Sequence, residues 1–220
     1  MFPAVTGAAS AKMGAMSNPT VIVALLVPAA YLLGTFPSAE LVARRRGRDV
    51  RSEGSGNPGA SNVARLIGWK AFLLVVVLDA AKGAIAAGVG LAVDGRPGAY
   101  ILGVAALLGH MLPVWSRFKG GKGVATGAGV MLVLFPIITL ALAVVWFVLT
   151  KVVRKASVAS LVVAIAYPVW AVVTGCAWWE IAVLAVLAAL VIVRHWRNVR
   201  RLVRGEELDL TLGTPQQGAA

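Results

Sequence analysis

Residues 124–155 read VATGAGVMLVLFPIITLALAVVWFVLTKVVRK, a long apolar run followed at once by a basic cluster. About 20 helical residues span a bilayer, so one crossing by residues 124–150 would place Lys151 on the opposite side from Lys122. Basic loops would then lie on both faces, which the positive-inside rule disfavours. Breaking the run at Pro136 into a hairpin of two helices of about 12 residues returns Lys151 to the side of Lys122. The sequence therefore predicts two short membrane helices around Pro136.

The composition of the whole chain is also typical of a membrane protein. It is 59% hydrophobic and only 14% charged, with a mean hydropathy of +0.84. The other apolar runs cover residues 20–43, 71–93, 99–115, 157–174 and 177–193. Together with the hairpin they predict an all-α polytopic membrane protein with seven transmembrane helical segments, its N-terminus outside and its C-terminus cytoplasmic.

Positive charge is concentrated between the apolar runs. All but three of the 21 Lys and Arg residues lie within residues 44–70, 117–122, 151–155 and 194–204, and the net charge is +12. Because these clusters lie directly beside apolar segments, they favour anionic lipid headgroups and soluble phosphates as partners and argue against nucleic acid. The sequence predicts no obligate protein partner.

The predicted organisation is a disordered N-terminal tail (residues 1–18), a single membrane-embedded domain (19–205) and a polar C-terminal tail (206–220). Cys176 is the only cysteine, so an internal disulfide is excluded. The two histidines are far apart and the carboxylates are scattered, so no metal site and no other cofactor is expected, and activity should not need a divalent ion.

A glycine-rich loop follows the first apolar run, where residues 49–62 read DVRSEGSGNPGASN. Its glycines let the backbone approach an oxyanion closely, and its polar side chains and one arginine can bind the anion. A flexible linker of the same composition is the alternative. The candidate residues are Arg51, Gly54, Ser55, Gly56, Asn57, Gly59, Ser61 and Asn62.

A second glycine-rich stretch, FKGGKGVAT at residues 118–126, contains a Gly-Lys pair but is not a Walker loop, because Arg117 and Gly123 occupy two required positions. What remains is a glycine hinge that presents lysines at a helix N-terminus, a suitable place for a small phosphate ester. A positive-inside stop signal explains the lysines but not the glycines. The candidates are Lys119, Gly120, Gly121, Lys122, Gly123 and Thr126.

Two later clusters add polar side chains. Ser157 and Ser160 begin an apolar run, where N-capping and substrate binding are equally good interpretations of Ser157. His195 and Asn198 are three residues apart and share a helix face, so the histidine could act as a general base or orient a phosphate. Within the apolar runs, Asp79 and Lys82 are interpreted as an ion pair or a contact within the helix bundle.

These motifs resemble the bacterial acyl-phosphate:glycerol-3-phosphate acyltransferases. The resemblance covers residues 34–207 and rests on GTFP (34–37), GSGNPGASN (54–62), LDAAKG (78–83), Gly109, His110 and Pro113, KGGKGVAT (119–126), Ser157 and Ser160, HWRN (195–198), Gly205 and Glu207. It implies a seven-helix enzyme of the bacterial inner membrane with a cytoplasmic active site. It also implies transfer of a fatty acyl group from acyl phosphate to the 1-hydroxyl of sn-glycerol 3-phosphate, giving lysophosphatidic acid and phosphate.

By this resemblance the catalytic residues are His195, Asn198, Ser157, Arg51 and Lys122, and Thr35 joins the substrate-binding residues named above. Other acyltransferases use a His with an Asp after four intervening residues, but Trp115 and Arg200 occupy those positions here. Since an acyl phosphate has a good leaving group, direct attack without a covalent acyl-enzyme is expected. The alternative is a transporter or flippase for a phosphorylated small molecule or lipid, which should place its polar groups near the bilayer midplane.

Overall fold

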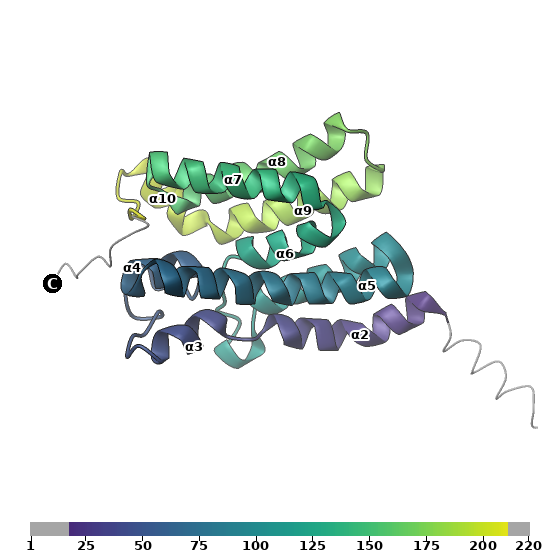
Figure 1. Ribbon diagram of the computed structural model, residues 1–220, viewed down its shortest axis with the longest axis horizontal. Coiled ribbons are helices and arrows are strands. Elements are labelled where there is room, and N and C mark those ends of the chain that lie inside the picture. Colours follow the sequence, from purple (N-terminus) through teal and green to yellow (C-terminus); the bar gives the residue numbers. More distant parts are fainter. Residues whose placement is uncertain (1–17, 211–220) are drawn as a thin grey trace, which may run out of the picture.

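The structure, a computed structural model, describes residues 18–210, and every regular element in that range is a helix (Figure 1). The elements are α2 (Pro19–Gly34), α3 (Ser38–Arg44), α4 (Ala60–Ile67), α5 (Trp69–Met111), a 3-10 turn η1 (Val114–Ser116), α6 (Val124–Leu134), α7 (Pro136–Val153), α8 (Ala156–Val173), α9 (Trp178–Arg194) and α10 (Trp196–Val203). The predicted N-terminal tail, apart from Asn18, and residues 211–220 lie outside the described residues.

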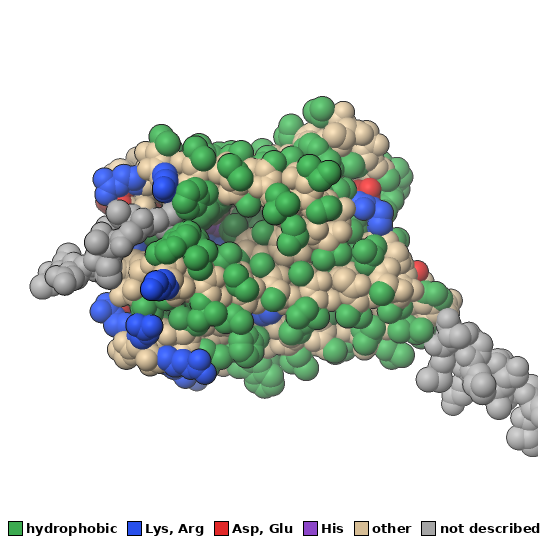
Figure 2. Space-filling view, viewed as in Figure 1, with side chains coloured by type: hydrophobic (Ala, Val, Ile, Leu, Met, Phe, Trp, Pro, Cys, Tyr) green, Lys and Arg blue, Asp and Glu red, His purple; other side chains and the backbone are tan. Residues whose placement is uncertain are grey.

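The helices form two layers joined by α6 (Figure 1). Helices α2 to α5 make one layer and α7 to α10 make the other. Lys and Arg side chains gather at the end of the molecule where α3, α4 and α10 lie (Figure 2). Basic loops that are far apart in sequence therefore meet at one end of the fold.

Helix α5 is bent back on itself. Asp94 and Gly95 leave helical geometry, and Gly95 has a φ of 60°. Lys82 Nζ lies 3.2 Å from His110 Nδ1, whereas a straight helix would separate these residues by about 42 Å. The arms 69–93 and 96–111 are therefore antiparallel neighbours, which confirms the break that the sequence predicts between the apolar runs at residues 71–93 and 99–115.

The hairpin at Pro136 is present, but its two helices are unequal. Helix α6 has 11 residues, while α7 has 18 and begins with Pro136 at its first turn. The expectation of two short helices is wrong for α7, because the helix continues through Lys151 to Val153. A lysine near a helix C-terminus is favoured by the helix dipole, and its charge therefore did not end the helix.

By length and composition, four helical stretches in the described part of the chain could cross a membrane, or five if the bent pair α9 and α10 forms one span. The stretch containing α2 is interrupted between Thr35 and Pro37, where the expected first apolar run divides into α2 and α3. Helix α6 is apolar but shorter than these candidates.

Glycine residues let α5 and α6 approach each other closely. A Cβ on Gly129 of α6 would overlap the carbonyl oxygen of Ala80 of α5, and one on Gly83 would overlap that of Thr126. Close backbone approach of this kind replaces the hydrophobic driving force that helices lack inside lipid.

We expect Gly129→Ala to destabilise the protein strongly, because the overlapping atom belongs to the backbone of a packed helix and cannot move aside. Gly88→Ala in α5 is the matched control, since a Cβ there would have no atom within 4 Å, and alanine favours helix by about 1 kcal/mol. Thermal unfolding in detergent should show a lower Tm for Gly129→Ala and an unchanged or higher Tm for Gly88→Ala. Equal Tm values would contradict this packing.

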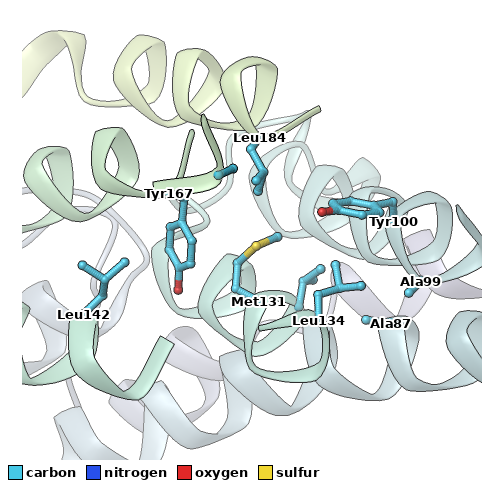
Figure 3. Packing of buried hydrophobic residues seen from close by; sticks show 10 residues of the cluster. Ala87, Ala99, Tyr100, Met131, Leu134, Leu142, Tyr167 and Leu184 are labelled. Carbon is cyan, nitrogen blue, oxygen red and sulfur yellow. The ribbon is translucent and has the colours of Figure 1, made fainter. Parts of the chain in front are cut away.

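Buried apolar side chains from both layers meet around α6 (Figure 3). Tyr100 of α5, Met131 and Leu134 of α6, Tyr167 of α8 and Leu184 of α9 are all nearly inaccessible. This core fixes the distance between the layers.

The segment 206–210 differs from the polar tail predicted after residue 205. Glu207 and Leu210 are 4% and 1% exposed, and Leu210 packs against Phe72 and Ala156. Asp209 accepts a hydrogen bond of 2.6 Å from Lys155 Nζ. The domain therefore continues at least to Leu210, because basic side chains at the end of α7 and the start of α8 pair with the acidic residues of this segment.

Candidate active site

A cavity of about 360 Å³ lies between the first arm of α5 and helices α6 to α9. Its size is within the range of small-molecule sites. Figure 2 shows a hollow on this face between α7 and α5, near the basic end. The cavity is polar at that end and apolar deeper in the bundle.

Four side chains from distant parts of the chain form a hydrogen-bonded cluster at the polar end. Lys122 Nζ donates to Asn198 Oδ1 at 2.5 Å. Asn198 Nδ2 donates to Glu207 Oε1 at 2.6 Å, and Ser157 Oγ donates to the same oxygen at 2.9 Å. All four line the cavity. The structure thus brings together Lys122, Ser157 and Asn198, which the sequence selected from three separate clusters.

His195 completes this group at the bend of 59° between α9 and α10. Its ring is 2% exposed and lines the cavity. Nδ1 lies 2.8 Å from the carbonyl oxygen of Val191. A carbonyl only accepts, so Nδ1 carries the proton and Nε2 is left as the acceptor of the neutral ring. The bend turns Asn198 toward Lys122 and Glu207.

The first glycine-rich loop is held in shape by Asn62. Its Nδ2 donates to the carbonyls of Val50 and Glu53, each at 3.0 Å, and its Oδ1 accepts from Ser55 N–H at 2.8 Å. Asn62 is 1% exposed. Its polar atoms are therefore used to fold the loop, a role that the sequence did not separate from anion binding.

The loop presents part of its candidate set to the cavity. Gly54 and Gly56 have φ values of 60° and 69°, which only glycine adopts readily, and they shape the turns without lining the cavity. The cavity-lining members are Ser55, Asn57, Gly59, Ser61 and Asn62.

Arg51 lies outside the cavity lining and joins the two glycine-rich loops. Its guanidinium donates to Glu40 Oε1 at 2.7 Å and to the carbonyl of Lys119 at 2.9 Å. The permanent charge expected beside the anion site is thus paired with a carboxylate and fixes one loop against the other.

The second glycine-rich loop is packed on the end of α5. Gly121 N–H donates to the carbonyl of His110 at 3.1 Å, and a Cβ on Gly121 would overlap the His110 ring. Arg194 donates to the carbonyls of Gly120 and Gly121 at 2.7 and 3.0 Å. These contacts hold the loop so that Lys122 and Gly123 line the cavity where α6 begins.

The His110 ring is itself supported by a buried ion pair. Lys82 Nζ lies 2.8 Å from Asp79 Oδ1 and 3.2 Å from His110 Nδ1. The interpretation of Asp79 and Lys82 as an ion pair is confirmed.

Four other candidates contact neighbouring helices or solvent. Thr35 caps α2, and its hydroxyl accepts from Trp115 Nε1 at 3.0 Å. Thr126 is fully buried and Lys119 is exposed, and neither lines the cavity. Ser160 does line it, but its hydroxyl donates to the Ala156 carbonyl and accepts from Trp146.

Sequence reasoning left Glu207, Arg201 and Arg65 out of the candidate set. Glu207 Oε2 accepts from Arg201 Nε at 2.9 Å, and Arg65 Nε donates to the Asp209 carbonyl at 2.8 Å. Two signals were available for Glu207, because it is among the motif residues of the family resemblance and because it is an acidic residue just after a strongly basic helix.

Charge in this cluster is set by burial and hydrogen bonding. Burial lowers the pKa of Lys122 to about 8, and the carboxylate of Glu207 only partly opposes this. Burial alone would raise the pKa of Glu207, but hydrogen bonds from Asn198, Arg201 and Ser157 outweigh it and the pKa is lowered. At neutral pH the cluster therefore contains an ammonium and a carboxylate joined through Asn198.

Residues 24–205 match a protein family described as glycerol-3-phosphate acyltransferase. A glycerol-3-phosphate acyltransferase from Bacillus cytotoxicus is 42% identical over 186 residues, which cover 83% of this chain and 92% of the relative. One from Shewanella loihica is 40% identical over 195 residues, covering 86% and 93%.

Two solved structures share the fold. One is PlsY (YgiH), an integral membrane glycerol 3-phosphate acyltransferase in its glycerol 3-phosphate form, with a TM-score of 0.81 and 38% identity over 86% of this chain and 96% of that one. The lysophosphatidic acid form has a TM-score of 0.78 and covers 85% of this chain and 94% of that one. The family match at residues 24–205 spans the positions of Lys122, Ser157 and Asn198 and ends before Glu207.

Proposed function

The chain belongs to the glycerol-3-phosphate acyltransferase family, and from this premise we propose a fatty acyl phosphate as donor and the 1-hydroxyl of sn-glycerol 3-phosphate as acceptor. It is an integral membrane enzyme that transfers an acyl group to glycerol 3-phosphate. The lining of the cavity supports a fatty acyl phosphate as the donor. Its polar end has glycine-rich loops and a buried lysine suited to phosphate groups, and it continues into an apolar region suited to a fatty chain.

We propose two phosphate positions within the polar end. We assign the donor phosphate to the loop containing Ser55, Asn57 and Ser61. We assign the phosphate of glycerol 3-phosphate to Lys122 and Ser157, beside the N-terminus of α6, where helix N–H groups and the helix dipole favour an anion. Arg51, Gly54, Gly56 and Asn62 support this site by shaping the loops.

The reaction is a direct transfer. The acceptor hydroxyl attacks the acyl carbonyl, a carbon–oxygen ester bond forms, and the bond to the phosphate oxygen breaks with its electron pair leaving on phosphate. His195 and Asn198 orient the reacting groups, and either His195 Nε2 or the donor phosphate accepts the hydroxyl proton.

We expect His195→Ala to lower kcat by about 100-fold, the usual contribution of a positioned proton acceptor. Steady-state kinetics with both substrates saturating measures this directly. Unchanged kcat would remove His195 from the chemistry and leave the donor phosphate as the base.

The test of the donor is phosphate release by the purified protein in detergent. With acyl phosphate, phosphate should appear only when glycerol 3-phosphate is added, together with lysophosphatidic acid in equal amount. Rapid mixing should show no burst of phosphate before the acceptor reacts. A burst equal to the enzyme concentration would replace direct transfer by an acyl-enzyme, and no release would exclude acyl phosphate as donor.

The pKa of Lys122 predicts that kcat/KM for glycerol 3-phosphate depends on pH. Because that pKa is about 8, the ammonium loses its proton as pH rises through 8, and kcat/KM for glycerol 3-phosphate should fall about tenfold per unit at higher pH. Lys122→Arg should abolish this decline, because a guanidinium stays protonated. A wild-type profile that stays flat to pH 10, after subtraction of acceptor-free hydrolysis, would contradict the assignment.

The membrane arrangement that fits this site has seven crossings: α2, the two arms of α5, and α6 to α9. The N-terminus is then outside, and the site faces the cytoplasm of a bacterial inner membrane. The gathering of basic side chains at one end supports this orientation (Figure 2). In spheroplasts, an impermeant thiol reagent should label the native Cys176 but not Lys151→Cys in a Cys176→Ala background. Labelling at position 151 would overturn the orientation.

A further inference from the structure

The cavity extends along α8 and α9 from its polar end into the bundle, and we call this stretch the arm. On α8 it is lined from Ser157 to Tyr167, ten residues apart. Along α9 it is lined from His195, which caps this helix, to Leu184, eleven residues apart. At 1.5 Å rise per residue the two separations correspond to about 15 Å and about 16.5 Å. The two helices therefore agree on where the arm ends.

A tyrosine held by a hydrogen bond lies at that end. Tyr167 Oη donates to Thr139 Oγ1 at 3.0 Å, and Thr139 Oγ1 donates to the Phe135 carbonyl at 2.8 Å. The ring extends from α8 between Leu142 and Met131 (Figure 3). Tyr167 and Leu184 are 8% and 2% exposed. The hydrogen bond to α7 holds the ring in place at this end of the cavity lining.

Chain length can be selected here only by steric fit. A fatty chain already dissolved in lipid gains little hydrophobic free energy by entering a protein groove, since lipid tails are as apolar as leucine. An extended chain with C–C bonds of about 1.5 Å and angles near 111° advances about 1.25 Å per carbon. An arm of about 15 Å therefore holds about 12 extended carbons before the chain meets Tyr167.

We propose that Tyr167, braced by Thr139 and opposed by Leu184, closes the acyl arm and sets the length of fatty chain that the enzyme transfers most efficiently. This inference rests on the proposed acyl phosphate donor. Carbons beyond the closed end must bend back toward the opening between α5 and α7, which strains the reactive geometry of longer donors.

The experiment is a competition assay on the purified full-length protein. Equimolar saturated acyl phosphates of 10 to 18 carbons are mixed with glycerol 3-phosphate, and the lysophosphatidic acids are quantified by mass spectrometry. Product ratios do not depend on the amount of folded enzyme, so a partly unstable variant still reports its selectivity. Product formed by the wild type tests whether acyl phosphate is the donor. The change in product ratio between each variant and the wild type tests whether Tyr167 closes the arm.

Two substitutions should shift the ratio in opposite directions. Tyr167→Ala opens the end and should enrich products longer than the wild-type optimum about tenfold, the discrimination typical of one or two methylenes in a fitted pocket. It leaves no orphaned hydroxyl, because Thr139 still donates to Phe135. Leu184→Phe narrows the end and should shift the optimum to shorter chains.

Val186→Phe is the matched control, because it adds the same ring on α9 at a position 60% exposed on the outside of the bundle. Its product ratio should equal that of the wild type. Identical ratios for Tyr167→Ala and the wild type, or shifts of the same sign for Tyr167→Ala and Leu184→Phe, would overturn the proposal and place the chain in the opening between α5 and α7.

Discussion

Replacing Lys122 with methionine is expected to reduce kcat/KM for glycerol 3-phosphate by about 1000-fold. The Lys122 ammonium lies at the polar end of the cavity and donates a hydrogen bond of 2.5 Å to Asn198. Removing a preorganised charge aimed at an anion in a site of low dielectric costs about 3 to 4 kcal/mol of transition-state binding. Methionine keeps the length and the apolar contacts of the lysine stem, so the loss reports the charge.

Lys70→Met is the matched control, because Lys70 is exposed at the start of α5 and the same atoms are exchanged. It should retain wild-type kinetics and Tm. For Lys122→Met, Tm should fall little, since burial disfavours the ammonium and Asn198 can still donate to Glu207. Near-wild-type kcat/KM in Lys122→Met would remove this residue from the anion site.

Replacing Glu207 with alanine is expected to lower both stability and activity. The carboxylate accepts hydrogen bonds from Ser157, Asn198 and Arg201, and its side chain is 1% exposed. Breaking a buried pair by removing one partner costs about 3 to 5 kcal/mol. We expect a clear fall in Tm and a loss of activity of at least about 100-fold in the protein that remains folded, because Asn198 loses the partner that fixes its orientation.

Glu206→Ala tests whether the effect is specific, since Glu206 is the adjacent acid and is exposed. It should leave Tm and activity unchanged. Kinetics below the Tm of both variants, normalised to folded protein, separate the two roles of Glu207. Full activity per folded molecule would reduce Glu207 to a stabilising residue.

Hydropathy and charge predicted most of the architecture. The reversal at residues 94–98, the break at Pro136 and the gathering of basic loops at one end followed from the positions of Pro, Gly, Lys and Arg. The length of α7 could not be predicted from the sequence. A lysine inside the last turn of a helix and a lysine just beyond the end of a helix give the same sequence pattern. The helix dipole and the apolar stem of Lys151, whose ammonium lies over the Phe147 ring, allow the helix to continue.

The sequence by itself determined the chemical groups of the site, because glycines, lysines, serines and the His195 and Asn198 pair occur at loop and helix-end positions typical of anion binding. Only the tertiary structure decided which of them meet. Asn62 and Arg51 proved to be tied within and between loops, whereas Glu207, from the segment that we expected to be a tail, joins Ser157 to Asn198. Hydropathy and charge act along the chain and can be read locally, but hydrogen-bond partners are chosen by packing between segments that are far apart in the sequence. Lys122 and Asn198 are 76 residues apart, and Arg65 and Asp209 are 144 residues apart.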